Sequence, residues 1–397
     1  MFRPVLASRV LRRNAARHLV AGTRRVSSVS EQATEDTAEA PVTSAAETED
    51  KVLDATVPEG KPKIVAEVER AGGDKYIEWE RTKITLAHLR TMKRYRTPIS
   101  MLTAYDYPTG LACDASRVEI VLVGDSLAQV CLGYDSTTRI TLDEMIHHCK
   151  AVARGCKTPF LVVDMPFGTY HGTPEETFHN AVRLVREGGA EAVKLEGGPE
   201  IAHHVEHLTL AGIPVFAHLG LMPQRAVQLG GYLPQARRFH SAKRLVEHAL
   251  VMEQAGAVAV VLEAVPPEVA EAATSRLKHA FTIGIGAGRG TDGQVLVWDD
   301  MLGNSRGRKP RFVRQFAHLR KHVDDGIAAY VNAVRRRTYP AYQTSNMYSM
   351  DSDQSRQLFA EWMERTRRGL ATENATTEGE NEPSSDLESQ TGMKARG

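Results

Sequence analysis

The sequence predicts an α/β protein that folds as a (β/α)8 TIM barrel, with an N-terminal closing helix and C-terminal helices. Eight apolar or β-branched runs alternate with stretches that are long enough for a helix, and helices of that kind connect parallel strands. The alternation extends over roughly 200 residues, which suits an eight-stranded barrel. Five of the runs end on a side chain that can bind a cation or move a proton. A doubly wound open sheet is the alternative fold.

The clearest apolar run is residues 118–126, with the sequence VEIVLVGDS. It predicts a strand that is buried on both faces and ends at Gly124. Further strands are expected at residues 98–103, 160–164, 190–196, 213–218, 258–263, 281–286 and 294–298. Helices are expected at residues 85–90, 142–154, 174–187, 200–210, 241–255, 310–319 and 323–334. The first of these helices closes the bottom of the predicted barrel.

The chemistry-bearing strand ends are Asp125, Asp164, Glu196, His218 and Glu263. Parallel strands joined by helical crossovers place all their C-terminal ends on one side, so these side chains are expected to converge on one face. An unpaired buried charge costs several kcal/mol. Each acid is therefore solvated, paired with a cation or bound to a metal.

Three of these groups, Asp125, Asp164 and Glu196, are carboxylates that repel one another unless a divalent cation lies among them. Oxygen ligands without a cysteine or a paired-histidine pattern favour a hard ion, and Mg²⁺ that keeps some of its water suits them better than zinc. The alternative is that all three are solvated acids at exposed strand ends.

Three further side chains complete the candidate site. Lys194 shares a strand face with Glu196, and it either pairs with a neighbouring acid or holds the carboxylate of an anionic substrate. Glu263 follows an apolar run, so burial is expected to raise its pKa toward the range of a general base, unless the strand end is solvated. His218 either assists proton transfer or is a hydrogen-bonded structural group.

Composition excludes several classes of function. The formal net charge of +1 argues against nucleic-acid binding, for which a strongly basic domain is expected. No apolar run approaches the ~20 residues that a membrane-spanning helix needs. The four cysteines show neither CxxC spacing nor a disulfide pattern, and we interpret them as reduced packing residues.

Both ends of the chain differ in composition from the middle. Residues 1–30 contain seven arginines and no acid, which predicts a mitochondrial transit peptide and a location in the matrix; a basic arm that contacts nucleic acid or membrane is the alternative. Residues 31–74 predict a disordered linker, residues 75–342 the catalytic domain, and residues 343–397 a mostly disordered tail. A weak amphipathic patch in this tail contains Leu358, Trp362 and Met363.

Ten short strings occur along the chain in the order seen in the ketopantoate hydroxymethyltransferase family. They include TAYDY at 103–107, LVGDSL at 122–127, DMPFGTY at 164–170, AVKLEGG at 192–198 and HLGLMPQ at 218–224. On these motifs the chain resembles that family over about residues 80 to 340. It departs from the family pattern at Ala128 and Ala236, where glycine is expected, and these departures concern loop geometry more than chemistry.

The resemblance implies a Mg²⁺-dependent enzyme. Such an enzyme transfers a one-carbon unit from 5,10-methylenetetrahydrofolate, its co-substrate, to 3-methyl-2-oxobutanoate. The product is 2-dehydropantoate, in the first step of pantothenate and coenzyme A biosynthesis. The resemblance also implies a homo-oligomer, typically a decamer, that uses the helices after Pro310.

The same resemblance assigns roles to the candidate residues. Asp125 and Asp164 coordinate the metal directly or through water, and Glu196 completes the metal site. Ser126 and Lys194 bind the keto acid, which Asp125 and Asp164 also hold. Glu263 is the catalytic base, with His218 as possible support.

Two other functions remain open on the sequence alone. One is a Mg²⁺-dependent C–C lyase of the phosphoenolpyruvate mutase and isocitrate lyase type that acts on a 2-keto acid, although the catalytic cysteine loop of those enzymes is not visible here. Dependence of turnover on methylenetetrahydrofolate distinguishes that lyase from a hydroxymethyltransferase. The other is a non-catalytic barrel that serves as an assembly protein, which the presence of all the site residues argues against.

Overall fold

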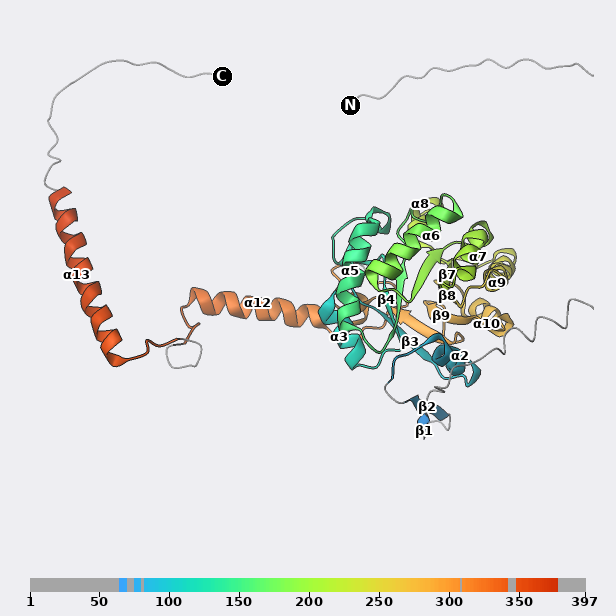
Figure 1. The fold of residues 1–397 in the computed structure, drawn as a ribbon, viewed down its shortest axis with the longest axis horizontal. Helices are drawn as coiled ribbons and strands as arrows, with labels where there is room; N and C mark the ends of the chain where they lie inside the picture. Colours follow the sequence, from blue (N-terminus) through green and yellow to red (C-terminus); the bar gives the residue numbers. More distant parts are fainter. Residues whose placement is uncertain (1–63, 70–74, 80–81, 308, 342–347, 378–397) are drawn as a thin grey trace, which may run out of the picture. The chain divides into compact units, whose positions relative to one another are not determined.

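The computed structural model describes residues 64–69, 75–79, 82–307, 309–341 and 348–377. Within these ranges eight parallel strands close into a barrel in the order β10-β3-β4-β5-β6-β7-β8-β9, with helices around it (Figure 1). The predicted (β/α)8 class is confirmed. None of the helices in these ranges is both long enough and apolar enough to cross a membrane.

The barrel strands are buried, as their nearly continuous apolar sequences require. Every residue of β5 and β6 is buried. Strand register sets Asp164 beside Lys194, and Glu196 beside His218, on neighbouring strands. The strands are β3 (Ile99–Thr103), β4 (Ile120–Val123), β5 (Phe160–Asp164), β6 (Ala192–Glu196), β7 (Val215–Gly220), β8 (Ala259–Glu263), β9 (Phe281–Ile285) and β10 (Gly293–Leu296).

The helices follow the strands in the expected alternation. Two of the longer ones begin with a capping box, in which Thr141 pairs with Glu144 and Thr173 with Glu176, and this arrangement satisfies the first free amides of the helix. The helices are α2 (Leu86–Arg94), α3 (Tyr107–Ala115), α4 (Leu127–Val130), α5 (Leu142–Gly155), α6 (Pro174–Arg183), α7 (Ala202–Leu210), α8 (Ala226–Leu229), α9 (Phe239–Gln254), α10 (Pro267–Arg276), α11 (Trp298–Met301), α12 (Leu319–Arg335) and α13 (Asp353–Thr377).

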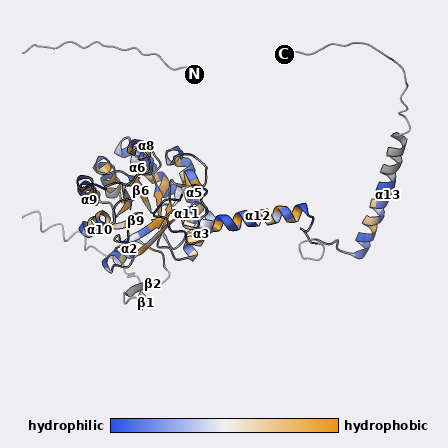
Figure 2. Ribbon diagram, turned by 180° about the vertical axis from the view of Figure 1, so that it is seen from behind, coloured by the Kyte–Doolittle hydropathy of each residue, from blue (hydrophilic) through white to orange (hydrophobic). Residues whose placement is uncertain are grey.

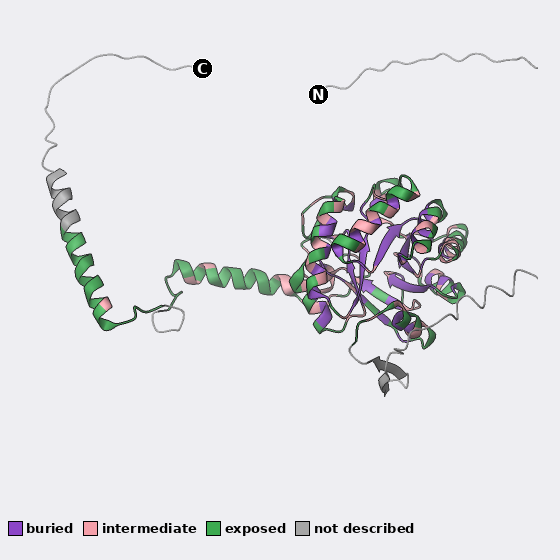
Figure 3. Ribbon diagram, viewed as in Figure 1, coloured by how far each residue is buried: buried purple, intermediate pink, exposed green. Residues whose placement is uncertain are grey.

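Apolar side chains fill the barrel and the layer between the barrel and its helices. Figure 3 shows the strands as buried and the outward faces of the helices as exposed. Inside the barrel, Phe216 and Phe281 meet edge to face with ring centroids 5.5 Å apart. Leu89 and Met92 of α2 belong to the same interior cluster. Helix α2 therefore closes one end of the barrel, as predicted, and the opposite end remains for the site.

The helix predicted at residues 310–319 does not form. The backbone amide of Phe316 donates to the carbonyl of Met301 at 2.8 Å, and the amide of Leu319 donates to Leu302 at 2.9 Å. These amides satisfy the carbonyls at the end of α11, so they do not take part in a helix of their own. Val313 is buried, and helix α12 begins only at Leu319.

The structure also differs from the prediction toward the two ends of the chain. Strand β1 (Ile64–Glu69) lies within the predicted linker and pairs antiparallel with β2 (Lys75–Trp79). Helix α13 lies within the predicted disordered tail; its sequence is rich in Glu, Arg, Gln and Ala, which favour helix. The predicted transit peptide at 1–30, the linker before residue 64 and the tail after residue 377 lie outside the described residues.

Ala236 adopts a left-handed backbone, with φ of 56°. A side chain with a Cβ atom adopts this conformation at a cost that glycine avoids. The expectation that glycine suits position 236 therefore has a conformational basis. Ala128 differs, because it is buried in the short helix α4.

Candidate active site

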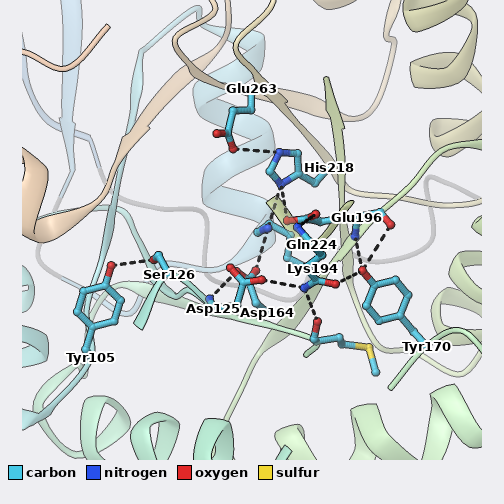
Figure 4. Close-up of polar contacts among 11 residues, drawn as sticks. Tyr105, Asp125, Ser126, Asp164, Tyr170, Lys194, Glu196, His218, Gln224 and Glu263 are labelled. Atoms are coloured by element: carbon cyan, nitrogen blue, oxygen red, sulfur yellow. Dashed lines mark hydrogen bonds and ion pairs between the residues drawn. The ribbon is translucent and has the colours of Figure 1, made fainter. Parts of the chain in front are cut away.

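The five strand-end groups and Lys194 converge at the end of the barrel opposite α2 (Figure 4). Together with Ser126 they line one cavity, which we call the reaction pocket. Its volume is about 190 Å³. Apolar side chains contributed by the strands complete its wall; they are Leu122, Val261, Ile285 and Val295. The pocket therefore combines ionisable groups with an apolar wall, and it suits a small, branched anionic molecule.

A buried ion pair lies at the centre of the reaction pocket. Lys194 Nζ is 3.0 Å from Asp164 Oδ1 and 3.0 Å from His218 Nδ1. Burial alone would lower the pKa of Lys194, but the surrounding carboxylates of Asp164 and Glu196 raise it above its usual value. Lys194 is therefore a fixed cation, and of the roles considered for it the salt bridge to Asp164 is present.

Asp125 and Glu196 are held by a residue that the sequence reasoning missed. Gln224 Nε2 donates to Asp125 Oδ2 at 2.9 Å, and the Gln224 backbone amide donates to Glu196 Oε2 at 2.9 Å. Its amide oxygen accepts a hydrogen bond from the Tyr170 hydroxyl. Gln224 thus links two of the predicted metal ligands. It lies in a single turn of 3-10 helix, Pro223–Arg225, that follows β7. So short an element has no distinguishing pattern, and only the place of Gln224 in the HLGLMPQ string gave a signal.

Two acids of the pocket, Asp125 and Glu196, resist ionisation because they are buried close to other carboxylates. Burial and the Coulombic effect of Asp164 raise the pKa of Asp125. Burial, above all, raises the pKa of Glu196 well beyond its usual range, although Lys194 opposes the shift. A bound cation would relieve both effects, because it favours the charged form of each acid.

Glu263 lies on the far side of His218. His218 Nε2 is 3.3 Å from Glu263 Oε2. Burial and the Lys194 charge lower the pKa of His218 well below its usual value, so the ring is neutral. Because the Lys194 ammonium donates to Nδ1, the single ring proton is on Nε2, where it faces Glu263. Burial, which Lys194 only partly offsets, raises the pKa of Glu263 to about 8.

Two hydroxyl groups lie at the edge of the reaction pocket. Ser126 Oγ is hydrogen-bonded to the Tyr105 hydroxyl at 2.9 Å, which in turn accepts from Thr103 at 2.7 Å. Thr137, which was not predicted, is buried, and its hydroxyl has no hydrogen-bond partner among the described residues. Both hydroxyls are placed to contact a ligand in the pocket.

The carboxylates of the reaction pocket are the kind of ligand that a hard metal ion prefers, but they are not arranged as a complete metal site. Within the described ranges, no three His, Cys, Asp or Glu side chains are arranged to hold a metal ion. Glu196 Oε1, however, is buried and lacks a hydrogen-bond donor among the described residues. Because Mg²⁺ commonly takes only one or two protein carboxylates together with water and substrate oxygens, the residues present fit such an ion.

Comparisons with known proteins identify the family. The ketopantoate hydroxymethyltransferase family matches residues 83–342. The chain belongs to the ketopantoate hydroxymethyltransferase family. The 3-methyl-2-oxobutanoate hydroxymethyltransferase of Bacillus cereus (strain ATCC 14579) is 47% identical over 68% of this chain and 95% of that protein. The enzyme of the same name from Oleidesulfovibrio alaskensis is 49% identical over 70% of this chain and 94% of that protein.

Membership in the ketopantoate hydroxymethyltransferase family confirms the resemblance drawn from the sequence strings and makes this chain an enzyme. Among solved structures, the phosphoenolpyruvate phosphomutase of Streptomyces platensis subsp. rosaceus has a TM-score of 0.44 and 14% identity, over 72% of this chain and 99% of that chain. So low a similarity does not distinguish one activity from another.

We expect Gln224→Ala to lower kcat/KM about tenfold to a hundredfold, as loss of a residue that orients ligating carboxylates commonly does. The substitution keeps the backbone contact to Glu196 but removes the side chain that holds Asp125. The matched control is Gln235→Ala, at a glutamine whose side-chain contact is to the Leu233 carbonyl. Steady-state kinetics and melting curves of both variants check this expectation. Equal kcat/KM in the two variants would exclude the orienting role.

Proposed function

We propose that the chain transfers a one-carbon unit from 5,10-methylenetetrahydrofolate to 3-methyl-2-oxobutanoate, giving 2-dehydropantoate, and so opens pantothenate and coenzyme A biosynthesis. The observation that carries the proposal is the arrangement of a fixed cation, Lys194, and a weakly acidic carboxylate, Glu263, around one pocket of 190 Å³. The printed names of the bacterial relatives agree with this substrate.

The first task of the site is to bind the keto acid. Lys194 is buried and positively charged, so it attracts the substrate carboxylate strongly in these apolar surroundings. Ser126 presents a hydroxyl beside it, held in place by Tyr105. The apolar wall then receives the isopropyl group, which carries the reacting C3 carbon.

The second task is to move a proton. The Glu263 carboxylate accepts the proton from C3, and the electron pair of that C–H bond becomes an enolate. The enolate C3 then forms a bond to the methylene carbon of the donor, and one water supplies the oxygen of the new hydroxyl group. The C3 proton and the second water proton end on the two folate nitrogens that release the methylene carbon, so atoms and charge balance.

The His218 ring prepares Glu263 for this step. Its Nε2 atom lies 3.3 Å from the carboxylate and has no hydrogen-bond partner among the described residues, so the Nε2–H group is available to donate to the ionised base. A pKa near 8 for Glu263 matches a base that must work close to neutral pH, whereas an ordinary glutamate is too weak a base.

We assign a Mg²⁺ ion to Asp125 and Asp164, with Glu196 close by. The support for this assignment is the surplus of buried carboxylates over the single Lys194 cation, together with the free oxygen of Glu196. When bound, the ion stabilises the negative charge that the keto oxygen gains in the enolate. Lys194 and Ser126 bind the substrate, and Glu263 transfers the proton.

The enzyme assembles with copies of itself, and α12 contributes to the contact. Four apolar side chains share one side of this helix, namely Val323, Ile327, Tyr330 and Val334, and all are exposed. Figure 2 shows hydrophobic and hydrophilic residues interspersed along α12, and within the described chain no residue of α12 is buried. An amphipathic helix of this kind needs a partner for its apolar side, and a decamer agrees with the family resemblance.

The enzyme works in the mitochondrial matrix. The support is the composition of residues 1–30, which are basic and free of acids, because a transit peptide of this kind is amphipathic and rich in arginine. The family match begins only at residue 83, so this basic segment lies outside the part shared with the family.

We expect Glu263→Gln to abolish exchange of the C3 proton of 3-methyl-2-oxobutanoate in deuterated water while keto-acid binding remains. For the unsubstituted enzyme without added metal, exchange should rise with pH through about 8 and then level off, because the active form has lost the Glu263 proton. Proton NMR measures the exchange directly. Exchange at the normal rate in Glu263→Gln would remove this residue from the role of base.

We expect Asp164→Ala to weaken Mg²⁺ binding and keto-acid binding together, because Asp164 orients Lys194 and supplies a metal ligand. Calorimetric titration of metal, with and without keto acid, measures both affinities. Asp143→Ala, which removes an acid that is 81% exposed and does not line the pocket, is the control and should change neither. If Asp164→Ala retained both affinities, the metal assignment would be wrong.

We expect Ile327→Asp to lower the oligomeric state, because the charge lies in the middle of the apolar side of α12. Asn332→Asp adds a charge at an exposed position on the other side of the same helix and should leave the assembly intact. Sedimentation velocity of both variants reports their masses. Assemblies of identical mass would show that α12 is not part of the interface.

We expect residues 1–30, fused to a fluorescent protein, to direct it to mitochondria in a eukaryotic cell. Replacing Arg12 and Arg13 by glutamate should abolish import, because import depends on the positive charge of the segment. Fluorescence microscopy with a mitochondrial dye measures whether the fusion protein and the dye have the same location in the cell. A diffuse cytosolic signal from the unaltered fusion would contradict the proposed location.

A further inference from the structure

A second cavity adjoins the reaction pocket, and we call it the side hollow. Residues of α4 and α11, residues 304–307 and Pro310 line most of it, and its volume is about 520 Å³. It shares five lining residues with the reaction pocket, namely Ser126, Gln129, Val297, Asp300 and Pro310. Two other hollows, beside α9, share none with the reaction pocket. A molecule in the side hollow therefore lies next to whatever the reaction pocket holds.

The sizes of the two cavities differ in a way that fits a two-substrate reaction. Drug-sized ligands occupy pockets of roughly 300–1,000 Å³. The reaction pocket, at 190 Å³, is below that range and suits a small keto acid. The side hollow, at 520 Å³, is within it. A hydroxymethyltransferase needs a one-carbon donor whose carbon reaches the bound acceptor, and a reduced folate is too large for the reaction pocket alone.

One wall of the side hollow accepts hydrogen bonds. Asp300 lines both cavities, and its Oδ1 atom accepts from Ser305 Oγ at 2.7 Å. The hydrogen bond from Ser305 reaches only Oδ1, so the Oδ2 atom of Asp300 does not take part in it. A pterin ring presents two N–H donors side by side, at N3 and at the 2-amino group, and a carboxylate accepts such a pair well. Asp300 is therefore a suitable partner for the pterin edge.

The outer part of the side hollow carries positive charge. The Arg306 side chain is 75% exposed, and its ion pair with Asp324 is 3.6 Å long, so this contact is weak and easily exchanged. Arg320 is held more firmly, because it donates twice to the Asn304 carbonyl, at 3.1 and 3.0 Å. The glutamate tail of a folate carries carboxylates, and the guanidinium group of Arg306 is free to turn toward them.

We propose that the side hollow binds the reduced-folate donor, with the pterin edge on Asp300 and the glutamate tail toward Arg306. This inference rests on the proposed function. It assigns the donor to a place in the structure and predicts that donor binding and keto-acid chemistry depend on different residues. The shared wall at Ser126 and Val297 is then where the methylene carbon meets the keto-acid C3 atom.

Two variants test the assignment, each scored on two separate readouts. Asp300→Asn keeps an acceptor for Ser305 but sets an amide against the pterin donors, and Arg306→Ala removes the exposed cation. We expect the KM for methylenetetrahydrofolate, and the Kd of tetrahydrofolate measured by calorimetry, to rise about tenfold or more in Asp300→Asn. Exchange of the C3 proton, measured with keto acid alone, should change far less. Arg306→Ala should raise the Kd of the glutamylated folate severalfold, and more so at low salt.

Arg237→Ala is the matched control, because Arg237 is an exposed arginine that lines a separate hollow; it should alter neither readout. Unchanged folate affinity in both Asp300→Asn and Arg306→Ala would overturn the side-hollow assignment while the proposed function stands. Loss of exchange equal to the loss of folate affinity would likewise overturn it, because the two cavities would then act as one. Absence of C3 exchange or of tetrahydrofolate binding in the unaltered enzyme would instead contradict the proposed function itself.

Discussion

The buried contact between Lys194 and Asp164 is the constraint on which the rest of the site depends. The two side chains are only 5% and 3% exposed, and removing both charges from water costs several kcal/mol for each ion. A protein keeps such a pair only where further partners compensate for that cost. Here the partners are His218 for the lysine and the backbone amide of Asp125 for the aspartate. The ends of four neighbouring strands, β4 to β7, are therefore fixed together.

The direction of each hydrogen bond follows from this ion pair. Lysine can only donate, so His218 must accept at Nδ1 and carry its proton at Nε2. The imidazole therefore offers Glu263 a donor without becoming charged itself. Gln224 acts similarly on the other side of the site, because its amide group donates to Asp125 and accepts from Tyr170. One buried cation thus sets the protonation of a histidine and, through it, the environment of Glu263.

The barrel and the convergence of its strand ends could be predicted from the sequence because both follow from patterns that repeat along the chain. Long apolar strands and intervening helices define a closed parallel barrel, and the topology then brings residues such as Asp125 and Glu263 together. Gln224 and Thr137 lie in single turns of 3-10 helix, which are too short for a periodicity to indicate which way a side chain points. The segment 310–319 has apolar residues at helical spacing, yet its amides bond to the end of α11. Helix α13 had too few apolar residues for a confident sequence signal, although its residues favour helix locally.

The small volume of the reaction pocket has a consequence for selectivity. Part of its wall is formed by Leu122, Val261, Ile285, Val295 and Leu296, all of which come from barrel strands that close packing holds rigid. A rigid apolar wall discriminates by shape: it admits a branched aliphatic chain and excludes the aromatic rings of other 2-keto acids, which share the same carboxylate and carbonyl. The enzyme can thus select its acceptor by steric exclusion. Its polar groups contact only the carboxylate and the carbonyl, which all 2-keto acids have in common.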